Sequence, residues 1–64
     1  MDNIYVFQYI NDLEQREGIP FDCGEHVDIR AINEPRAWDE FKEWARINDE
    51  TVVEVQLVEM YRDR

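Results

Sequence analysis

Residues 33–47 read Asn-Glu-Pro-Arg-Ala-Trp-Asp-Glu-Phe-Lys-Glu-Trp-Ala-Arg-Ile, and this stretch decides the fold. Asn33 or Glu34 can cap a helix, and Pro35 fits the first turn, where the N–H that proline lacks would have no partner. Apolar residues recur at steps of three and four, as in a helix with one buried face. The sequence therefore predicts a helix that runs to about residue 47, with an apolar stripe made of Ala37, Trp38, Phe41, Trp44 and Ala45.

The other side of the predicted helix is charged. A charged helix face is usually solvated, and it can also serve as an acidic recognition surface. Paired carboxylates perform acid–base catalysis only where burial or a cleft separates their pKa values. We therefore expect no such chemistry from the residues of this face, which are Arg36, Asp39, Glu40, Lys42, Glu43 and Arg46.

Two tryptophans lie six residues apart in this helix, so they cannot point the same way. We expect one of Trp38 and Trp44 to lie deep in the core and the other at its margin, with Phe41 between them. The alternative is that they anchor an interface, where tryptophan is enriched.

Three further stretches are typical of β-strands. Residues 4–10, Ile-Tyr-Val-Phe-Gln-Tyr-Ile, are apolar on both faces, which suits a central strand or a strand whose second face meets another molecule. Residues 26–32 alternate polar and apolar side chains, as in a half-buried strand. Residues 52–61 alternate again, with Val53, Val55, Leu57 and Tyr61 in one phase and Val52, Glu54, Gln56, Val58 and Met60 in the other.

The segment of residues 11–24 has two interpretations. Asn11 can cap a helical turn, with Glu14 at the reciprocal position of a capping box and with Gly18 and Pro20 placed to end the turn. Alternatively, the segment is an open connection, longer than an ordinary hairpin loop.

The order strand, strand, helix, strand predicts a single α+β domain over residues 1–64. We expect a three-stranded antiparallel-type sheet (β-β-α-β) with the helix packed on one face. The first two strands pair as an arm, whereas the sequence does not show which of them the last strand joins.

One helix covers only one face of such a sheet. If the aliphatic side of the first strand meets the core, Tyr5, Phe7 and Tyr9 form an aromatic row outside, and Met60 shares the uncovered side. An apolar patch with an acidic rim is typical of a contact surface. This surface could serve a partner or a second copy, or the 11–24 segment could cover it.

The composition excludes several classes of function. Sixteen Asp and Glu against seven Lys and Arg give the 64 residues a net charge of −9. Nucleic acids and anionic membranes are therefore poor direct partners. No apolar run approaches the roughly 20 residues of a membrane span. Serine is absent, which excludes an acylating serine enzyme.

The single cysteine, Cys23, cannot form an internal disulfide, and nothing near Met1 resembles a signal peptide, so we expect a cytoplasmic protein. Cys23 and His26 are spaced like half of a zinc site, but no further Cys or His completes it. No set of nucleophile, base and orienting group can be assembled either. We expect no metal, no cofactor and no catalytic residue.

The acidity can steer the protein to a basic partner. Proteins that hold phosphates have such surfaces, and a small acidic fold would compete there with the nucleic-acid backbone. The contact residues that we predict on this basis are Asp39, Glu40, Glu43 and Glu54. The alternative is that the acidity serves solubility alone.

The strand arm, the acidic helix Ala-Trp-Asp-Glu-Phe-Lys-Glu-Trp-Ala of residues 37–45 and the final strand resemble small phage-encoded inhibitors of bacterial machinery. The likeness is to the T7-type inhibitor of host RNA polymerase in particular, and it covers about residues 26–64. That family carries an alternating arginine pair on its last strand, and Arg62 and Arg64 have the same spacing. Small anti-CRISPR proteins share similar element orders. The resemblance implies a compact viral inhibitor in the host cytoplasm.

The sequence thus predicts a non-enzymatic protein that binds and inhibits or modulates a host protein with a basic, nucleic-acid-handling surface, as a DNA mimic does. The alternative is an accessory domain that forms a homodimer through its exposed aromatic sheet face.

Overall fold

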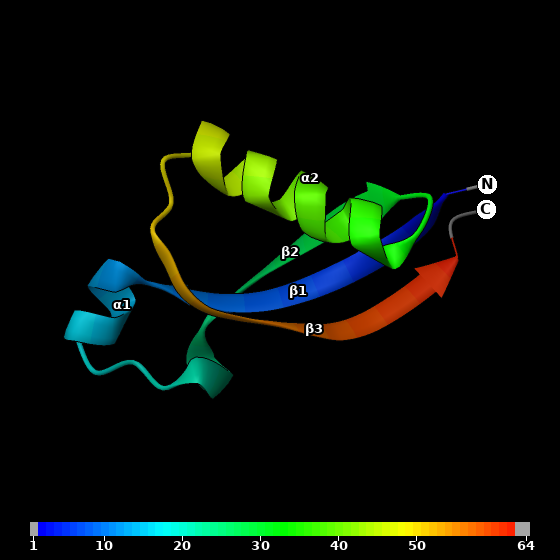
Figure 1. The fold of residues 1–64 in the computed structure, drawn as a ribbon. Coiled ribbons are helices and arrows are strands. Elements are labelled where there is room, and N and C mark those ends of the chain that lie inside the picture. Colours follow the sequence, from blue (N-terminus) through cyan, green and yellow to red (C-terminus); the bar gives the residue numbers. More distant parts are fainter. Residues whose placement is uncertain (1, 63–64) are drawn as a thin grey trace.

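A computed structural model describes residues 2–62. The chain forms β1 (Asn3–Asn11), α1 (Asp12–Arg16), the 3₁₀ turn η1 (Phe21–Cys23), β2 (Glu25–Ala31), α2 (Glu34–Ile47) and β3 (Val52–Arg62). The three strands form an antiparallel sheet in the order β2-β1-β3, with α2 on one face (Figure 1). The predicted α+β fold is confirmed, and β3 joins the sheet beside β1.

Helix α2 begins and ends where its local sequence predicts. The Asn33 side chain accepts a hydrogen bond from the backbone N–H of Arg36 at 3.0 Å, and Pro35 occupies the first turn. At the other end, Asp49 adopts a φ of 56°, and the Asn48 side chain donates to the carbonyl oxygen of Trp44. Both ends are therefore fixed by residues next to the helix.

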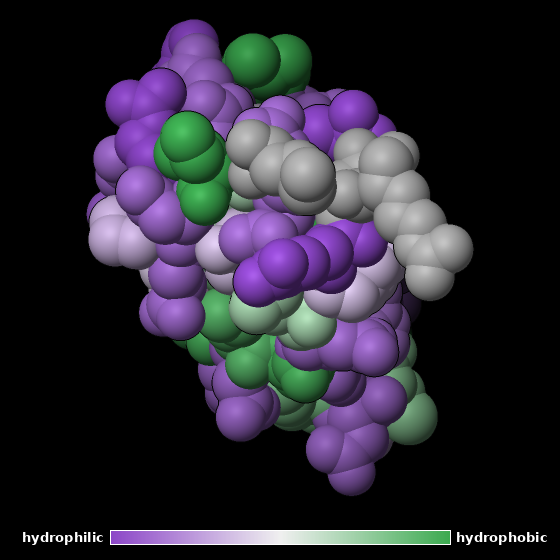
Figure 2. Space-filling view, turned by 90° about the vertical axis from the view of Figure 1, so that its right-hand side faces the viewer, coloured by the Kyte–Doolittle hydropathy of each residue, from purple (hydrophilic) through white to green (hydrophobic). Residues whose placement is uncertain are grey.

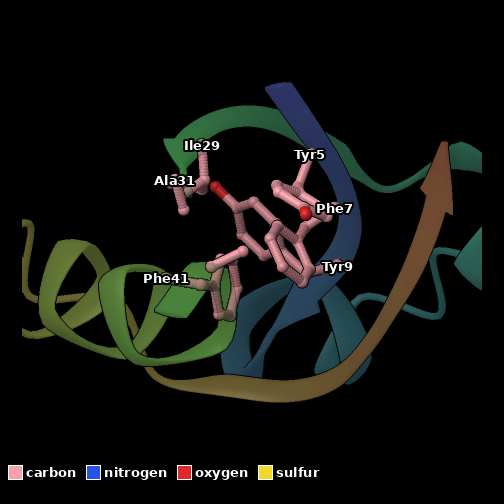
Figure 3. Close-up of a cluster of buried hydrophobic side chains, with 7 residues drawn as sticks. Tyr5, Phe7, Tyr9, Ile29, Ala31 and Phe41 are labelled. Atoms are coloured by element: carbon pink, nitrogen blue, oxygen red, sulfur yellow. The ribbon is translucent and has the colours of Figure 1, made fainter. Parts of the chain in front are cut away.

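The core lies between α2 and the aromatic side of β1 (Figure 3). Phe7 is completely buried, and its ring lies 4.9 Å from that of Phe41 and 4.8 Å from that of Trp38. Trp44 stacks on the other side of Phe41 at 5.8 Å. Both tryptophans are half-buried and flank Phe41, so the expectation of one deep tryptophan was wrong. Such ring pairs contribute about 0.5–1.5 kcal/mol each beyond the area they bury.

Strand β3 changes phase twice along β1. Val6 pairs with Glu59 but Phe7 with Leu57, and this leaves Val58 as an extra residue. A second extra residue, Val53, follows the pair of Ile10 and Glu54. Each β-bulge reverses which side chains face α2.

The phase predicted for β3 was therefore partly wrong. Met60 lies opposite Tyr5, on the side of the sheet that α2 covers, whereas Tyr61 lies opposite Ile4 on the far side. Val52 also packs against the core instead of sharing the far face. A prediction from strict alternation assigns these residues to the wrong face of the sheet, because each extra residue in a bulge shifts the alternation by one position.

The far face of the sheet is covered at one end by α1 and η1. Asn11 and Glu14 form a capping box that begins α1, which confirms the short helical turn. The Gln8 side chain donates to the carbonyl oxygen of Phe21 at 2.7 Å, so η1 lies against β1. Farther along, the Tyr61 hydroxyl lies 3.5 Å from the Asp28 carboxylate, which bridges the two edge strands.

Gly24 is expected to be essential for the approach of η1 to β1. A Cβ atom at this position would lie 2.4 Å from the carbonyl oxygen of Tyr9 and 2.7 Å from a methyl group of Ile10. We expect Gly24→Ala to lower the free energy of unfolding by about 1–3 kcal/mol, the usual cost of overpacking. Unfolding in denaturant measures this difference in the free energy of unfolding between the variant and the wild type.

Gly18→Ala is the comparison variant. Gly18 has a φ of 77°, but nothing lies within 4 Å of a Cβ atom there. Only backbone strain of about 1–2 kcal/mol acts at this site. If η1 could be moved at little cost, Gly24→Ala would be as stable as the wild type.

Candidate functional site

The aromatic row of β1 is buried, which corrects one of the two predicted contact surfaces. Tyr5, Phe7 and Tyr9 are at most 5% exposed and point toward α2 (Figure 3). The bulky aliphatic side of β1 faces the other way, where Tyr61 and the η1 segment cover part of it. Met60 is 51% exposed, so of the four predicted residues of this face only Met60 can contact another molecule.

The predicted helix carboxylates are all exposed on α2. Glu40 and Glu43 line a shallow groove between α2 and β2, whose other side is formed by Asp28 and Arg30. Arg46 donates through Nε to a Glu43 carboxylate oxygen at 3.1 Å, and this hydrogen bonding lowers the pKa of Glu43. Glu43 is therefore partly neutralised.

Glu54 does not share a surface with these helix carboxylates. It pairs with Ile10, which follows Tyr9 in β1 and so faces away from α2. The sheet therefore separates Glu54 from Asp39 and Glu40. Arg62 lies exposed at the end of β3 opposite Asn3, and Arg64 lies outside the described residues.

The densest negative charge lies at the end of the molecule formed by α1, η1, the turn after α2 and the start of β3, on the left in Figure 1. The strand register brings these segments together, because Tyr9, Ile10 and Asn11 pair with Glu25, Glu54 and Val52. We call this region the acidic end; its carboxylates are those of Asp12, Glu14, Glu17, Asp22, Glu25, Asp49, Glu50 and Glu54.

The acidic end contains a single cation, Arg16, which is ion-paired with Asp12 at 2.8 Å. Elsewhere in residues 2–62, seven carboxylates stand against five Lys and Arg side chains. This end therefore carries a net charge of −7, most of the total of −9. At the opposite end of the molecule, β1 begins and β3 ends. The surface there shows hydrophilic side chains with a few small hydrophobic areas between them (Figure 2).

Hydrogen bonds join two carboxylates of the acidic end, from separate segments, to one residue of β1. Asn11 donates from its backbone N–H to Glu14 at 2.9 Å and from its side chain to Glu50 at 3.1 Å. Burial raises the pKa of the Tyr9 hydroxyl to about 12, and the charges of Glu50, Glu25 and Glu14 contribute to this rise. Carboxylates from three separate segments thus act on one phenol.

Sequence reasoning missed most of this surface. The run of acidic residues over 12–25, with Arg16 as its only cation, is visible in the sequence. This run lies next to Asp49, Glu50 and Glu54 only because β3 pairs with β1. The sequence did not predict that pairing.

Cys23 and His26 are both exposed, at the end of η1 and the start of β2. Within residues 2–62, no group of three or more His, Cys, Asp or Glu side chains is arranged to hold a metal ion. The same residues contain no helix with the length and apolar character needed to cross a membrane.

Comparison of the chain with models of protein families, with curated proteins and with solved structures finds no match.

Proposed function

We propose that this chain is a small, non-enzymatic binding protein that inhibits or modulates a protein with a basic, nucleic-acid-handling surface. The observation that carries the proposal is the acidic end, where eight carboxylates face a single, already paired cation. A surface whose charges all have one sign raises the association rate with an oppositely charged partner. It also selects against partners of like charge.

A surface built to hold phosphates is a suitable target because its cations are spaced for a row of negative charges. Binding there releases counterions, as a nucleic acid does, so affinity falls steeply with added salt. The protein then acts as a competitor of the nucleic-acid backbone, as a DNA mimic does. The resemblance to phage inhibitors of host RNA polymerase and to anti-CRISPR proteins agrees with this class, and host cytoplasm is the matching compartment.

The proposal places the contact at the acidic end more than on α2. Glu17, Asp22 and Glu54 are exposed, and within residues 2–62 no hydrogen bond or ion pair occupies their carboxylates. On α2, by contrast, Glu43 is paired with Arg46, and Asp39 and Glu40 lie on a face that also carries Arg36, Lys42 and Arg46, so the net negative charge of that face is small. We therefore expect Asp39 and Glu40 to contribute less than the acidic end.

A pull-down from bacterial lysate tests the proposal with two variants of equal charge change. Glu17→Lys/Asp22→Lys reverses two carboxylates of the acidic end, and Asp39→Lys/Glu40→Lys reverses two on α2. We expect wild type to retain a nucleic-acid-handling protein that high salt or added DNA releases. The acidic-end variant should retain it at least about tenfold less, and the helix variant should retain most of it.

Circular dichroism of both variants shows whether they are folded, since all four sites are exposed. Equal retention by the acidic-end variant and wild type would contradict the assignment of the surface. Retention that DNA does not displace would contradict competition with nucleic acid.

A further inference from the structure

Strand β3 is an open edge of the sheet. It pairs only with β1, and no other strand lies along its outer side within residues 2–62. Edge strands are usually short, charged or covered, because their unpaired N–H and C=O groups can bind another strand. β3 runs over 11 residues. Seven large hydrophobic side chains are exposed within the described residues, and β3 holds four of them, Val53, Val58, Met60 and Tyr61.

The face of β3 toward α2 is also left incompletely covered. Helix α2 lies over β1 and β2, and a groove of about 390 Å³ separates it from β3. Trp38, Phe41, Val52 and Val55 line this groove, with Lys42, Arg46 and Glu50 at its rim. Leu57 and Met60 continue the same face, opposite Phe7 and Tyr5. An added strand beside β3 would extend an apolar surface that already exists.

We infer that β3 is the interface of a homodimer in which two copies pair antiparallel through this edge. The pairing joins two sheets into one of six strands with both α2 helices on the same face. A two-fold axis perpendicular to the sheet relates the copies, which is the usual symmetry of dimers. The occupant of the open edge is thus a second copy of this chain.

In one register, the paired side chains that flank the bulge lie on matching faces of the joined sheet. If the axis passes between Val58 and Glu59, Leu57 of one copy lies opposite Met60 of the other, both on the side of α2. Gln56 then lies opposite Tyr61, both on the far side, and Val58 opposite Glu59. Over residues 55–62, no carboxylate lies directly opposite another carboxylate in this register, and the bulge at Val58 coincides in the two copies, so both strands bend at the same point.

The charges along β3 favour the antiparallel direction. Its first residues belong to the acidic end, with Asp49, Glu50 and Glu54, whereas its last described residue is Arg62. Antiparallel pairing brings Arg62 of one copy to Val55 of the other, beside Glu50 at the rim of the groove. It also places the two acidic ends at opposite ends of the joined strands, far beyond a Debye length of about 8 Å at physiological salt. A parallel arrangement would place them together.

Sedimentation equilibrium of the purified chain, from micromolar to near-millimolar concentration, tests the inference without any other protein. We expect a reversible monomer–dimer equilibrium. Because both copies are acidic, dimerisation should strengthen or stay constant as salt is added, the opposite of binding to a basic partner. Failure of the dimer is therefore distinguishable from failure of the proposed function. A wild-type chain that stays monomeric over the whole range would overturn the inference.

Substitutions at two comparable valines test where the interface lies. Val58 and Val53 are both extra residues of β-bulges and are 44% and 40% exposed, but only Val58 lies in the paired segment. We expect Val58→Glu, which places a carboxylate against Glu59 of the second copy, to raise the dimer dissociation constant at least about tenfold. Val53→Glu should leave it within about twofold. Equal shifts for the two variants would contradict the β3 interface.

Val58→Lys tests the register itself. The new cation would face Glu59 of the second copy, so dimerisation should be retained or strengthened. If Val58→Lys weakens the dimer as much as Val58→Glu, the proposed register is wrong. Circular dichroism establishes that each variant is folded, and Met60→Glu, at a 51% exposed side chain, replaces Val58→Glu if that variant does not fold.

Discussion

Phe7→Ala is expected to abolish cooperative folding at room temperature. Within residues 2–62, Phe7 is the one large side chain with no exposed surface, and its ring contacts those of Trp38 and Phe41. Truncating a buried phenylalanine costs about 3–5 kcal/mol, from lost burial and from the cavity that remains. A core in a chain of this size rarely supplies more than about 3–5 kcal/mol of stability. The loss therefore equals the whole stability, and thermal unfolding followed by circular dichroism should show no transition.

Two control variants, Phe7→Leu and Leu13→Ala, show how large the effect of Phe7→Ala is. Leucine fills part of the ring volume, so Phe7→Leu should fold with a loss of about 1–2 kcal/mol. Leu13 is 62% exposed on α1, and its truncation should change the stability by no more than about 0.5 kcal/mol. A Phe7→Ala chain that unfolds cooperatively within a few degrees of wild type would show that the core does not depend on this ring.

The elements that could be predicted are those whose signals are local. Asn33 and Pro35 mark the start of α2, and the capping box of Asn11 and Glu14 marks α1, because a cap satisfies backbone groups only a few residues away. The half-buried strand β2 and the central strand β1 follow from side-chain alternation and from apolar residues on both faces. These elements can be predicted without knowing which distant segments pair with them.

The remaining features depend on contacts between distant segments. Which face of β1 meets α2 could not be predicted, because Ile4 and Ile10 are as apolar as Tyr5 and Tyr9. The aromatic face is buried because the rings of β1 interlock with Phe41 and Trp44. The phase of β3 was missed for a different reason, since its two bulges leave no trace in a regular alternation.

The two contact surfaces that we propose differ in the forces that would drive association. The acidic end depends on long-range charge and is sensitive to salt, whereas the β3 edge offers backbone hydrogen bonds and apolar side chains. They lie on adjoining parts of the molecule, because β3 begins within the acidic end. In the antiparallel dimer both acidic ends stay exposed, at opposite ends of the joined strands. The proposed dimer would therefore present two negative surfaces to the proposed basic partners.

The second large effect is a loss of stability at alkaline pH, caused by Tyr9. The pKa of its hydroxyl is about 12 in the folded protein, chiefly because of burial, against 10.0 for an ordinary tyrosine. A raised pKa means that the fold holds the proton more tightly than the unfolded chain does. The Tyr9 contribution is therefore fully present below pH 10, and stability falls as the pH rises from 10 to about 12. Since one pKa unit corresponds to about 1.4 kcal/mol, the full shift sets an upper limit of about 3 kcal/mol, and solvent screening of the hydroxyl should reduce the loss to about 1–2 kcal/mol.

Tyr9→Phe isolates this effect, because phenylalanine keeps the ring that packs on Phe41 and Trp44 but cannot ionise. Urea unfolding at a series of pH values should give a wild-type curve that falls below the Tyr9→Phe curve above pH 10. Added salt should reduce the gap only in part, since it screens Glu50, Glu25 and Glu14 but leaves the larger burial effect unchanged. Parallel curves for the two proteins would mean that the Tyr9 hydroxyl reaches water freely.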